Sequence, residues 1–463
     1  MLKQEEVKKV LLEATKTGAD FAELFIEDTT TINVMLLEDK IDDCQTANLY
    51  GAGLRLLKGM EETYGYTNDV SLKGLLDLAN KLNKFYQGEV LVKDICFNDT
   101  KTLNHTIIKK LSIDEPLEKK INYLREINKA SKAYSSEIIQ STAGVSEFVQ
   151  HVYVYNTNGV CKEDVRNNIR FNGGAIAEAE GLGKQAGGAN YGGNFGLDAY
   201  DNYDFGALGR QAAKQAVTML HAPQVKGGIY DVVINNSFGG VIFHEACGHA
   251  LEASAVSRGL SVFTGKLGQK IAADCVTAID DGTIPNEWGS ENIDDEGHVT
   301  QKNVLIENGI LKSYMVDYKN SRLMGCESTG SGRRQSYRFM PTSRMTNTYI
   351  ANGPYEFDEL IKNTKYGIFA KELGGGSVNP ATGEFNFSVN EGYMIEDGKI
   401  TTPVRGATLV GKGSEVLLNI DMVANNQSNG YGMCGAASGS IPVCVGQPTI
   451  RVRNMTVGGN GGR

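Results

Sequence analysis

Apolar and polar positions in the first 105 residues follow two different periods. Near the amino terminus apolar residues recur at helical spacing, at Val7, Val10, Leu11 and Ala14. Gly18 follows them, as is typical of a helix end. From residue 21 to residue 66 short alternating segments predict strands, and a second helical stripe then begins at Leu72, with Asp69 as its expected cap. We therefore predict a helix, sheet, helix unit that forms an amino-terminal α+β domain over residues 1–105.

The same periods return in residues 106–222, which we expect to form a central α+β region. A helical stripe follows Asp114, its expected N-cap, and Pro116. Two long strand patterns then meet at Asn158-Gly159, a dipeptide that suits a tight hairpin turn. The glycine-rich stretch 181–196, "GLGKQAGGANYGGNFG", predicts a surface loop before a last helical stripe.

Residues 223–463 differ in kind, because strand and turn signals dominate after the helix expected around His244. The segments "LIENGIL" (305–311) and "MIEDGKI" (394–400) each predict a hairpin around an Asn-Gly or Asp-Gly turn. We therefore expect a mostly β carboxy-terminal domain. The fold class predicted for the whole chain is α+β, with helix and sheet units followed by this β-rich domain.

Composition narrows the possible functions. Lys plus Arg total 46 against 55 for Asp plus Glu, a formal charge of -9, and no basic run offers a surface for phosphates, so we expect no direct nucleic-acid ligand. The start "MLKQEEVKKV" is polar where a signal peptide is apolar, and no run approaches the ~18 apolar residues of a membrane span. We expect a cytoplasmic protein whose scattered cysteines are thiols.

The stretch "VIFHEACGHALEAS" (241–254) is the strongest candidate for chemistry. His244, Glu245 and His249 follow the order of a zinc peptidase motif, but the histidines are five positions apart instead of four. On a regular α-helix that spacing places them about 140° apart. A π-type turn of about 4.4 residues would bring them back onto one face, and Gly248 makes such a distortion easier. We therefore expect a distorted helix that carries a metal site.

Other motifs are weaker candidates. The cluster at 330–344 contains Arg333 and Arg334, which could hold the carboxylate of a peptide or could form ion pairs within a loop, as could Arg338 and Arg344. His298 lies among acids and could be a spare ligand or proton donor. The stretch "GATLVGKG" (406–413) lacks the hydroxyl residue that a phosphate-binding loop requires.

Several motifs taken together resemble one family. "HEACGHALE", "SVFTGKLGQKIA", "IDDEG", "NVLIENGILKSYM", "STGSGRRQSY", "RMTNTY" and "GMCG...VGQPTIRV" resemble the TldD branch of the TldD/PmbA metallopeptidases, also called modulators of DNA gyrase. The resemblance covers nearly all of residues 225–463, extends to "GAGLRLLKGMEETYGYTND", and is loose between them. It implies a cytoplasmic zinc-dependent peptidase with a His-Glu-x-x-x-His motif. It also implies a related partner subunit that lacks the metal motif and helps to enclose the active site.

Carried over to this chain, the resemblance makes His244 and His249 zinc ligands and Glu245 the catalytic acid and base. The residues alone leave the third ligand open. Glu252, three positions after His249, is the economical choice. Cys434 stands between glycines, but without further information a free cysteine is more commonly a buried structural thiol. Cys434 occupies the place of the family's cysteine ligand, so the resemblance favours it and leaves Glu252 to orient a ligand.

The expected function is therefore a zinc-dependent peptidase that hydrolyses unfolded or short peptides. Two other functions stay open. The chain could be a non-catalytic or regulatory subunit of a proteolytic complex, or a metal-dependent amidase, because zinc chemistry does not define the acyl group. We expect the partner to be a PmbA-type subunit or a second copy of the chain, and we expect no contact with a membrane.

Overall fold

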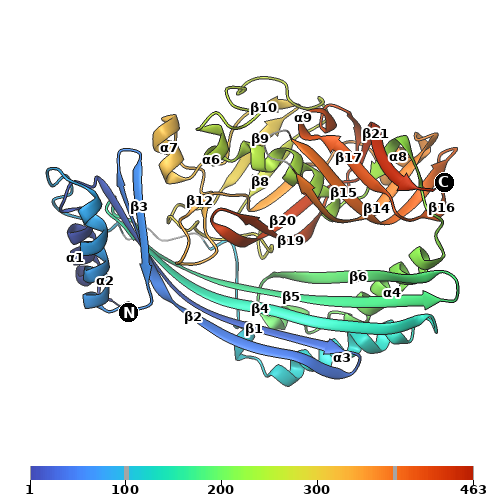
Figure 1. Ribbon diagram of the computed structural model, residues 1–463, viewed down its shortest axis with the longest axis horizontal. Helices are drawn as coiled ribbons and strands as arrows, with labels where there is room; N and C mark the ends of the chain where they lie inside the picture. The colour runs from blue at the N-terminus through green and yellow to red at the C-terminus, as the bar shows by residue number, and fades with distance from the viewer. Residues whose placement is uncertain (1, 99–103, 379–382, 462–463) are drawn as a thin grey trace.

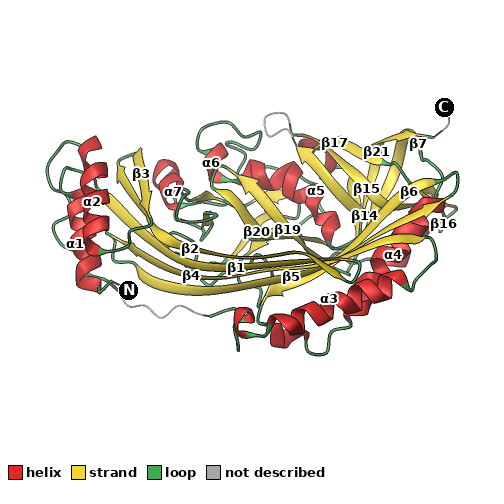
Figure 2. Cartoon of the chain, turned by 60° about the horizontal axis from the view of Figure 1, so that its bottom comes forward, coloured by secondary structure: helices red, strands yellow, loops and turns green. Residues whose placement is uncertain are grey.

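The computed structural model describes residues 2–98, 104–378 and 383–461. A curved six-stranded sheet forms its centre (Figure 1). Helices cover one face of this sheet, and the β-rich carboxy-terminal region lies against the other (Figure 2). We call the face that carries Glu23 and Arg55 the inner face, because the carboxy-terminal region contacts it, and the face that carries Leu24 and Leu54 the outer face.

The six strands of the central sheet are long and antiparallel. They are β1 (Phe21–Leu37), β2 (Lys40–Lys58), β3 (Glu61–Thr67), β4 (Ile138–Asn156), β5 (Cys161–Ala179) and β6 (Gly183–Asn194). Their order is β3-β2-β1-β4-β5-β6. The hairpin predicted at Asn158-Gly159 is confirmed, because it joins β4 to β5. The regions that the sequence separated at residue 105 share this one sheet.

Four helices bury apolar stripes on the outer face. α1 (Gln4–Thr15) and α2 (Leu72–Leu82) pack on one end of the sheet, over Leu24 and Leu54. α3 (Leu117–Lys132) and α4 (Phe205–His221) lie at the other end. Among the described residues, no helix has the length and apolar character needed to cross a bilayer.

Two of the predicted helix caps are wrong. α2 begins after Ser71, whose hydroxyl accepts a hydrogen bond from the Gly74 N–H at 3.1 Å, while Asp69 accepts from the Ser71 N–H. α3 begins after Pro116, and Asp114 lies in a separate 3₁₀ turn. Proline suits a helix start because its φ is fixed and it has no N–H to leave unsatisfied.

The glycine-rich stretch is a strand, so the prediction of a surface loop there is wrong. β6 pairs with β5 along its whole length, from Asn194 opposite Asn168 to Gly183 opposite Ala179. Its small residues allow α4 to approach closely, since a Cβ at Gly187 would lie 2.1 Å from the Ala212 carbonyl oxygen. The glycines of this strand allow a helix to pack closely against it. A glycine-rich composition alone does not distinguish such a strand from a surface loop.

The carboxy-terminal region is mostly β, which confirms the α+β fold class. Its longer strands form two sheets, one of which closes into a barrel because β15 pairs with both β14 and β17. The strands are β7 (Lys226–Ile234), β8 (Ala278–Asp281), β9 (Lys302–Glu307), β10 (Ile310–Leu311), β11 (Gly332–Arg333), β12 (Thr342–Ser343), β13 (Asn347–Ile350), β14 (Tyr366–Val378), β15 (Glu384–Glu396), β16 (Lys399–Val404), β17 (Thr408–Lys412), β18 (Ile420–Val423), β19 (Ser428–Ala436), β20 (Gly439–Gln447) and β21 (Ile450–Asn460).

Short helices connect these strands, and both predicted hairpins are confirmed. The helices are α5 (Val241–Phe243), α6 (Ala253–Val256), α7 (Tyr318–Met324), α8 (Phe357–Lys362) and α9 (Gly413–Val416). The hairpin within 305–311 pairs β9 with β10, and the hairpin within 394–400 pairs β15 with β16.

Buried ion pairs join the carboxy-terminal region to the inner face of the sheet. Arg55 on β2 contacts Glu23 on β1 at 2.9 Å and Glu296 of the carboxy-terminal region at 2.7 Å. Arg166 on β5 contacts Asp295 at 2.8 Å. All five side chains are buried, so each charge depends on its partners for stabilisation. The contacts fix the carboxy-terminal region on the sheet.

Candidate metal centre

The His-Glu motif lies on an irregular helix that follows a buried strand. β7 ends at Ile234, and the chain then passes through a short turn and the 3₁₀ helix η4 (Phe238–Gly240) into α5. Phe243 and Ile242 of α5 are buried in the core of the carboxy-terminal region. This packing gives the motif a rigid base.

The π-type turn predicted from the five-residue spacing is confirmed. Residues His244–Gly248 form a π-helical turn, η5, and the His249 N–H donates to the carbonyl of His244, five residues earlier. The 3₁₀ turn η6 (His249–Leu251) follows. As a result the two imidazole rings lie together, with their centroids 5.0 Å apart. The wider turn places both histidines on one side of the helix.

Gly248 has a different part in this turn from the one predicted. Its φ of -53° and ψ of -54° are ordinary helical values that any residue can adopt. The side chain of Met345 packs directly against it instead, and a Cβ at Gly248 would lie 2.3 Å from the Met345 sulfur. Glycine at this position therefore allows close packing and is not needed for backbone strain.

A third donor reaches the histidines from a distant strand. Cys434 lies on β19 and is 5% exposed. Its Sγ is 3.3 Å from Nε2 of His244 and 3.4 Å from Nε2 of His249. One ligand atom from each of the three residues lies within 4.8 Å of the other two. We call these residues the donor group.

The donor group fits a zinc ion in both chemistry and spacing. Imidazole nitrogen and thiolate sulfur bind zinc at about 2.0–2.1 Å and 2.3 Å, so at a tetrahedral angle the nitrogen and sulfur atoms would be about 3.6 Å apart. The two nitrogen to sulfur distances of 3.3 and 3.4 Å are close to that value. Three protein donors are also the number that catalytic zinc sites use.

The surroundings of His244 favour its neutral form. The ring is 2% exposed, and its Nδ1 lies 3.4 Å from the hydroxyl of Thr348 on β13. Burial, with His249 and Arg344 adding to it, lowers the pKa of His244 well below its usual value. Only the neutral ring has a lone pair to offer a metal, so this environment suits a ligand.

Two carboxylates accompany His249. Its Nδ1 contacts Glu252 at 3.2 Å, which leaves Nε2 directed to Cys434. Burial opposes the charged ring, but Glu252 and Cys434 outweigh it and hold the pKa of His249 well above its usual value, so a metal ion would have to displace a proton from this ring. Glu245 lies beside the donor group, with its Oε2 3.8 Å from Nε2 of His249. Burial raises the pKa of Glu245. The charge of Glu252 also raises this pKa, while His249 lowers it.

Arg344 ties the strand of Cys434 to the rest of the site. This fully buried guanidinium donates to the carbonyl of Cys434, to the Ser438 hydroxyl at 2.8 Å and to the Gly439 carbonyl at 2.9 Å. Its Nε is 4.0 Å from Glu252. From the sequence, Arg344 was a possible binder of a peptide carboxylate. Its contact with Cys434 was missed because the two residues are 90 positions apart and no local sequence pattern connects them.

The other predicted site residues lie outside the donor group, with Arg333 and Arg334 in buried ion pairs and His298 at a partly exposed position. Arg333 binds Glu291 through two hydrogen bonds of 2.7 and 3.2 Å. Arg334 binds Glu23 at 2.5 Å on the inner face. His298 is 3.8 Å from Asp294, in a separate group of metal-binding residue types with Glu296.

The carboxylates of this second group already have partners. Asp294 accepts hydrogen bonds from three backbone N–H groups, including that of His298, and Glu296 binds Arg55. For Arg333 and Arg334 the geometry thus matches the ion-paired alternative set out from the sequence.

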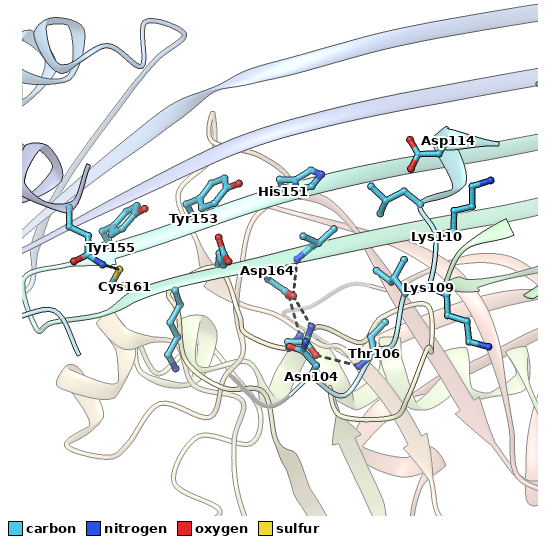
Figure 3. Close-up of a pocket in the computed structure, with 17 residues that line it drawn as sticks. Asn104, Thr106, Lys109, Lys110, Asp114, His151, Tyr153, Tyr155, Cys161 and Asp164 are labelled. Carbon is cyan, nitrogen blue, oxygen red and sulfur yellow. Dashed lines mark hydrogen bonds between the residues drawn. The ribbon is translucent and has the colours of Figure 1, made fainter. Parts of the chain in front are cut away.

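A large cavity lies elsewhere on the molecule. It measures about 920 Å³ and is bounded by β4, β5 and the segment around Thr106 (Figure 3). His151 and Tyr153, on the outer face of the sheet, line it, and none of the donor group does. Its size therefore does not mark it as the site of metal chemistry.

Family models match the chain in three consecutive pieces. Residues 207–459 match the PmbA/TldA metallopeptidase C-terminal domain, residues 110–220 the central domain and residues 22–84 domain 1 of the same family. The first of these matches alone covers more than half of the chain and includes the whole donor group.

Comparison with individual proteins also finds relatives of this chain and solved structures with its fold. A curated Haemophilus influenzae protein named metalloprotease TldD homolog is 36% identical over 95% of this chain and 93% of its own. The solved structure of a putative modulator of a DNA gyrase from Thermotoga maritima has a TM-score of 0.81, with 20% identity over 98% of this chain and all of its own. TldE from Thermococcus kodakarensis has a TM-score of 0.76, with 19% identity over 98% of this chain and 99% of its own.

Proposed function

The chain belongs to the TldD/PmbA metallopeptidase family, and we propose that it is a zinc-dependent peptidase that hydrolyses unfolded or short peptides. The observation that supports this most directly is the donor group, whose nitrogen to sulfur distances of 3.3 and 3.4 Å are close to those of tetrahedral zinc ligands. His244, His249 and Cys434 would hold the ion. Glu245, beside them, is the general base and acid.

The residues around the donor group suit peptide hydrolysis. Bound zinc supplies Lewis acidity, which makes water more acidic and a peptide carbonyl more electrophilic. Glu245 accepts the proton of the attacking water and passes it to the leaving amine, a transfer for which a carboxyl of raised pKa is suited. Glu252 fixes the tautomer of His249 by accepting from its Nδ1, so that Nε2 is free to bind.

We also propose that a second subunit encloses the site, either a PmbA-type relative or another copy of the chain. Resemblance to the family supports this, as does the fold shared with a protein named TldE. A site enclosed in this way admits extended chains and excludes compact domains. Unfolded substrates should therefore be cleaved in preference to folded ones.

Zinc-dependent cleavage of an unfolded substrate tests the function. Purified chain should contain about one zinc ion and should degrade a denatured, reduced protein while leaving the same protein intact in its native form. A chelator should abolish the cleavage, and added zinc should restore it. Hydrolysis of small amides but not of peptides would instead support an amidase. No hydrolysis of either by zinc-loaded chain would support a non-catalytic subunit.

Arg344→Lys should weaken zinc binding without unfolding the chain. Lysine keeps the charge but cannot hold Cys434, Ser438 and Gly439 together as the planar guanidinium does. Loss of such a supporting contact typically costs 10–100-fold in metal affinity. Competition with a zinc chelator measures the change, and Arg338→Lys, at an exposed position, is the matched control. Equal zinc affinity in both variants would rule out this role for Arg344.

A further inference from the structure

The chain turns sharply between β7 and the motif helix, within residues 236–240, which we call the elbow turn. Ser237 has a φ of 62° and a ψ of -123°, the values of the first central residue of a type II′ turn. The Gly239 N–H donates to the Asn236 carbonyl at 3.5 Å and closes the turn. Glycine dominates this position because a side chain there is strained. A serine at this φ therefore needs contacts that hold it.

Contacts with the hairpin that carries Cys434 hold Ser237 in this conformation. Its Oγ donates to the Asn429 carbonyl at 2.9 Å, and its N–H donates to the Gln447 carbonyl at 3.2 Å. Asn429 lies on β19 and Gln447 on β20, so one residue is tied to both strands of the hairpin. The hydroxyl binds a main-chain carbonyl, whereas a serine nucleophile needs a base as its partner. Its contacts therefore point to a part in positioning.

Glycines let the elbow turn lie directly against β19. A Cβ at Gly430 would lie 2.8 Å from the Cα of Phe238, and one at Gly432 would lie 3.9 Å from the Phe238 ring. Gly430, Gly432 and Cys434 alternate along β19 and so face the same side of the strand. The thiol is thus on the face against which the elbow turn packs. The position of that turn therefore sets how far the two histidines, which follow it in the chain, lie from the thiol.

We propose that Ser237 is a positioning residue of the metal centre, whose hydroxyl holds the strand of Cys434 at the distance from the motif helix that the donor group requires. This role rests on the proposed function, because it serves the zinc site. Ser237 binds the open end of the hairpin at Asn429, while Arg344 binds its turn at Ser438. A hairpin held at one end alone would be free to pivot, and the thiol would then move relative to both rings.

Two substitutions separate the hydroxyl of Ser237 from its backbone conformation. Ser237→Ala removes the hydroxyl and keeps the strain, whereas Ser237→Gly removes both. We expect both variants to bind zinc about 10–100-fold more weakly than the wild type in competition with a chelator, the usual loss for a contact that supports a ligand. Ser237→Gly should nevertheless unfold at a higher temperature than Ser237→Ala, because glycine adopts this turn without strain.

The matched control is Ser313→Ala, which should leave zinc affinity unchanged. The Ser313 hydroxyl also donates to a main-chain carbonyl at 2.9 Å, that of Val304, and lies outside the donor group. Wild-type zinc affinity in Ser237→Ala would overturn the proposal. Wild-type affinity in Ser237→Gly would overturn it as well, because the backbone conformation alone would then position the strand.

Cobalt substitution shows whether the thiol itself has moved. Cobalt-loaded protein absorbs light through the bond between thiolate and metal, and this band should shift or weaken in Ser237→Ala but not in Ser313→Ala. A general loss of stability would not alter the spectrum of fully loaded protein. An unchanged band in Ser237→Ala at saturating cobalt would therefore contradict the role in positioning.

Thiol labelling of the metal-free chain tests the same role without zinc. Cys434 is 5% exposed, so a thiol reagent reaches it only when the hairpin opens away from the helix. Loss of one hydrogen bond should speed its labelling about 2–10-fold in Ser237→Ala, as measured by peptide mapping, and Ser313→Ala should not differ from the wild type. Faster labelling in a chain that binds no zinc would support the role of Ser237 and refute the zinc site alone. Unchanged labelling would overturn the role of Ser237, whatever the zinc content.

Discussion

Glu245→Gln should reduce peptide hydrolysis by about 10²–10⁴-fold, the usual contribution of a general base. Glutamine has nearly the same shape but cannot accept a proton at neutral pH. The zinc content should stay near that of the wild type, because Glu245 is outside the donor group. Steady-state cleavage of an unfolded peptide and metal analysis of the same sample measure the two quantities.

The control for this substitution is Glu327→Gln, at an exposed position away from the motif. Both variants remove one carboxylate charge, so a loss of activity common to both would not be specific to the site. Hydrolysis at the wild-type rate by a zinc-loaded Glu245→Gln chain would refute the assigned role. Loss of zinc in that variant would mean that Glu245 is a ligand.

The local geometry of the motif could be predicted from the sequence because it depends on neighbours in the chain. The five-position spacing of His244 and His249 requires a wider turn if both are to face one ion, and the π-helical turn is present. The hairpins at 305–311 and 394–400 follow from short turn signals in the same way. Such features are decided by backbone sterics within a few residues.

Features that depend on distant segments were harder to predict. The ion partner of Arg334 is Glu23, 311 positions away, and no local pattern connects them. β6 was misassigned because its glycines meet α4, a contact that exists only in the folded chain. Cys434, 190 positions from His244, was selected only through the family resemblance, since the residues alone favour a buried structural thiol there.

Cys434→Ala should remove most of the zinc, while Glu252→Gln should keep it under saturating conditions. A zinc site binds with about 10–16 kcal/mol, so one donor of three accounts for roughly 4 kcal/mol, or about 10³-fold in affinity. Glu252 contacts His249 through Nδ1, away from Cys434, and its loss should cost about 10–100-fold. Chelator competition and metal analysis distinguish the two ranges.

The matched control is Cys444→Ala, which removes another buried thiol from the adjacent strand β20. Cys444 contacts Glu287 and is not in the donor group, so its loss should leave zinc unchanged even if packing suffers. If Cys434→Ala retains full zinc while Glu252→Gln loses it, the carboxylate is the third ligand. The 3.3 and 3.4 Å contacts of the thiol with both rings would then be packing between a buried cysteine and two histidines.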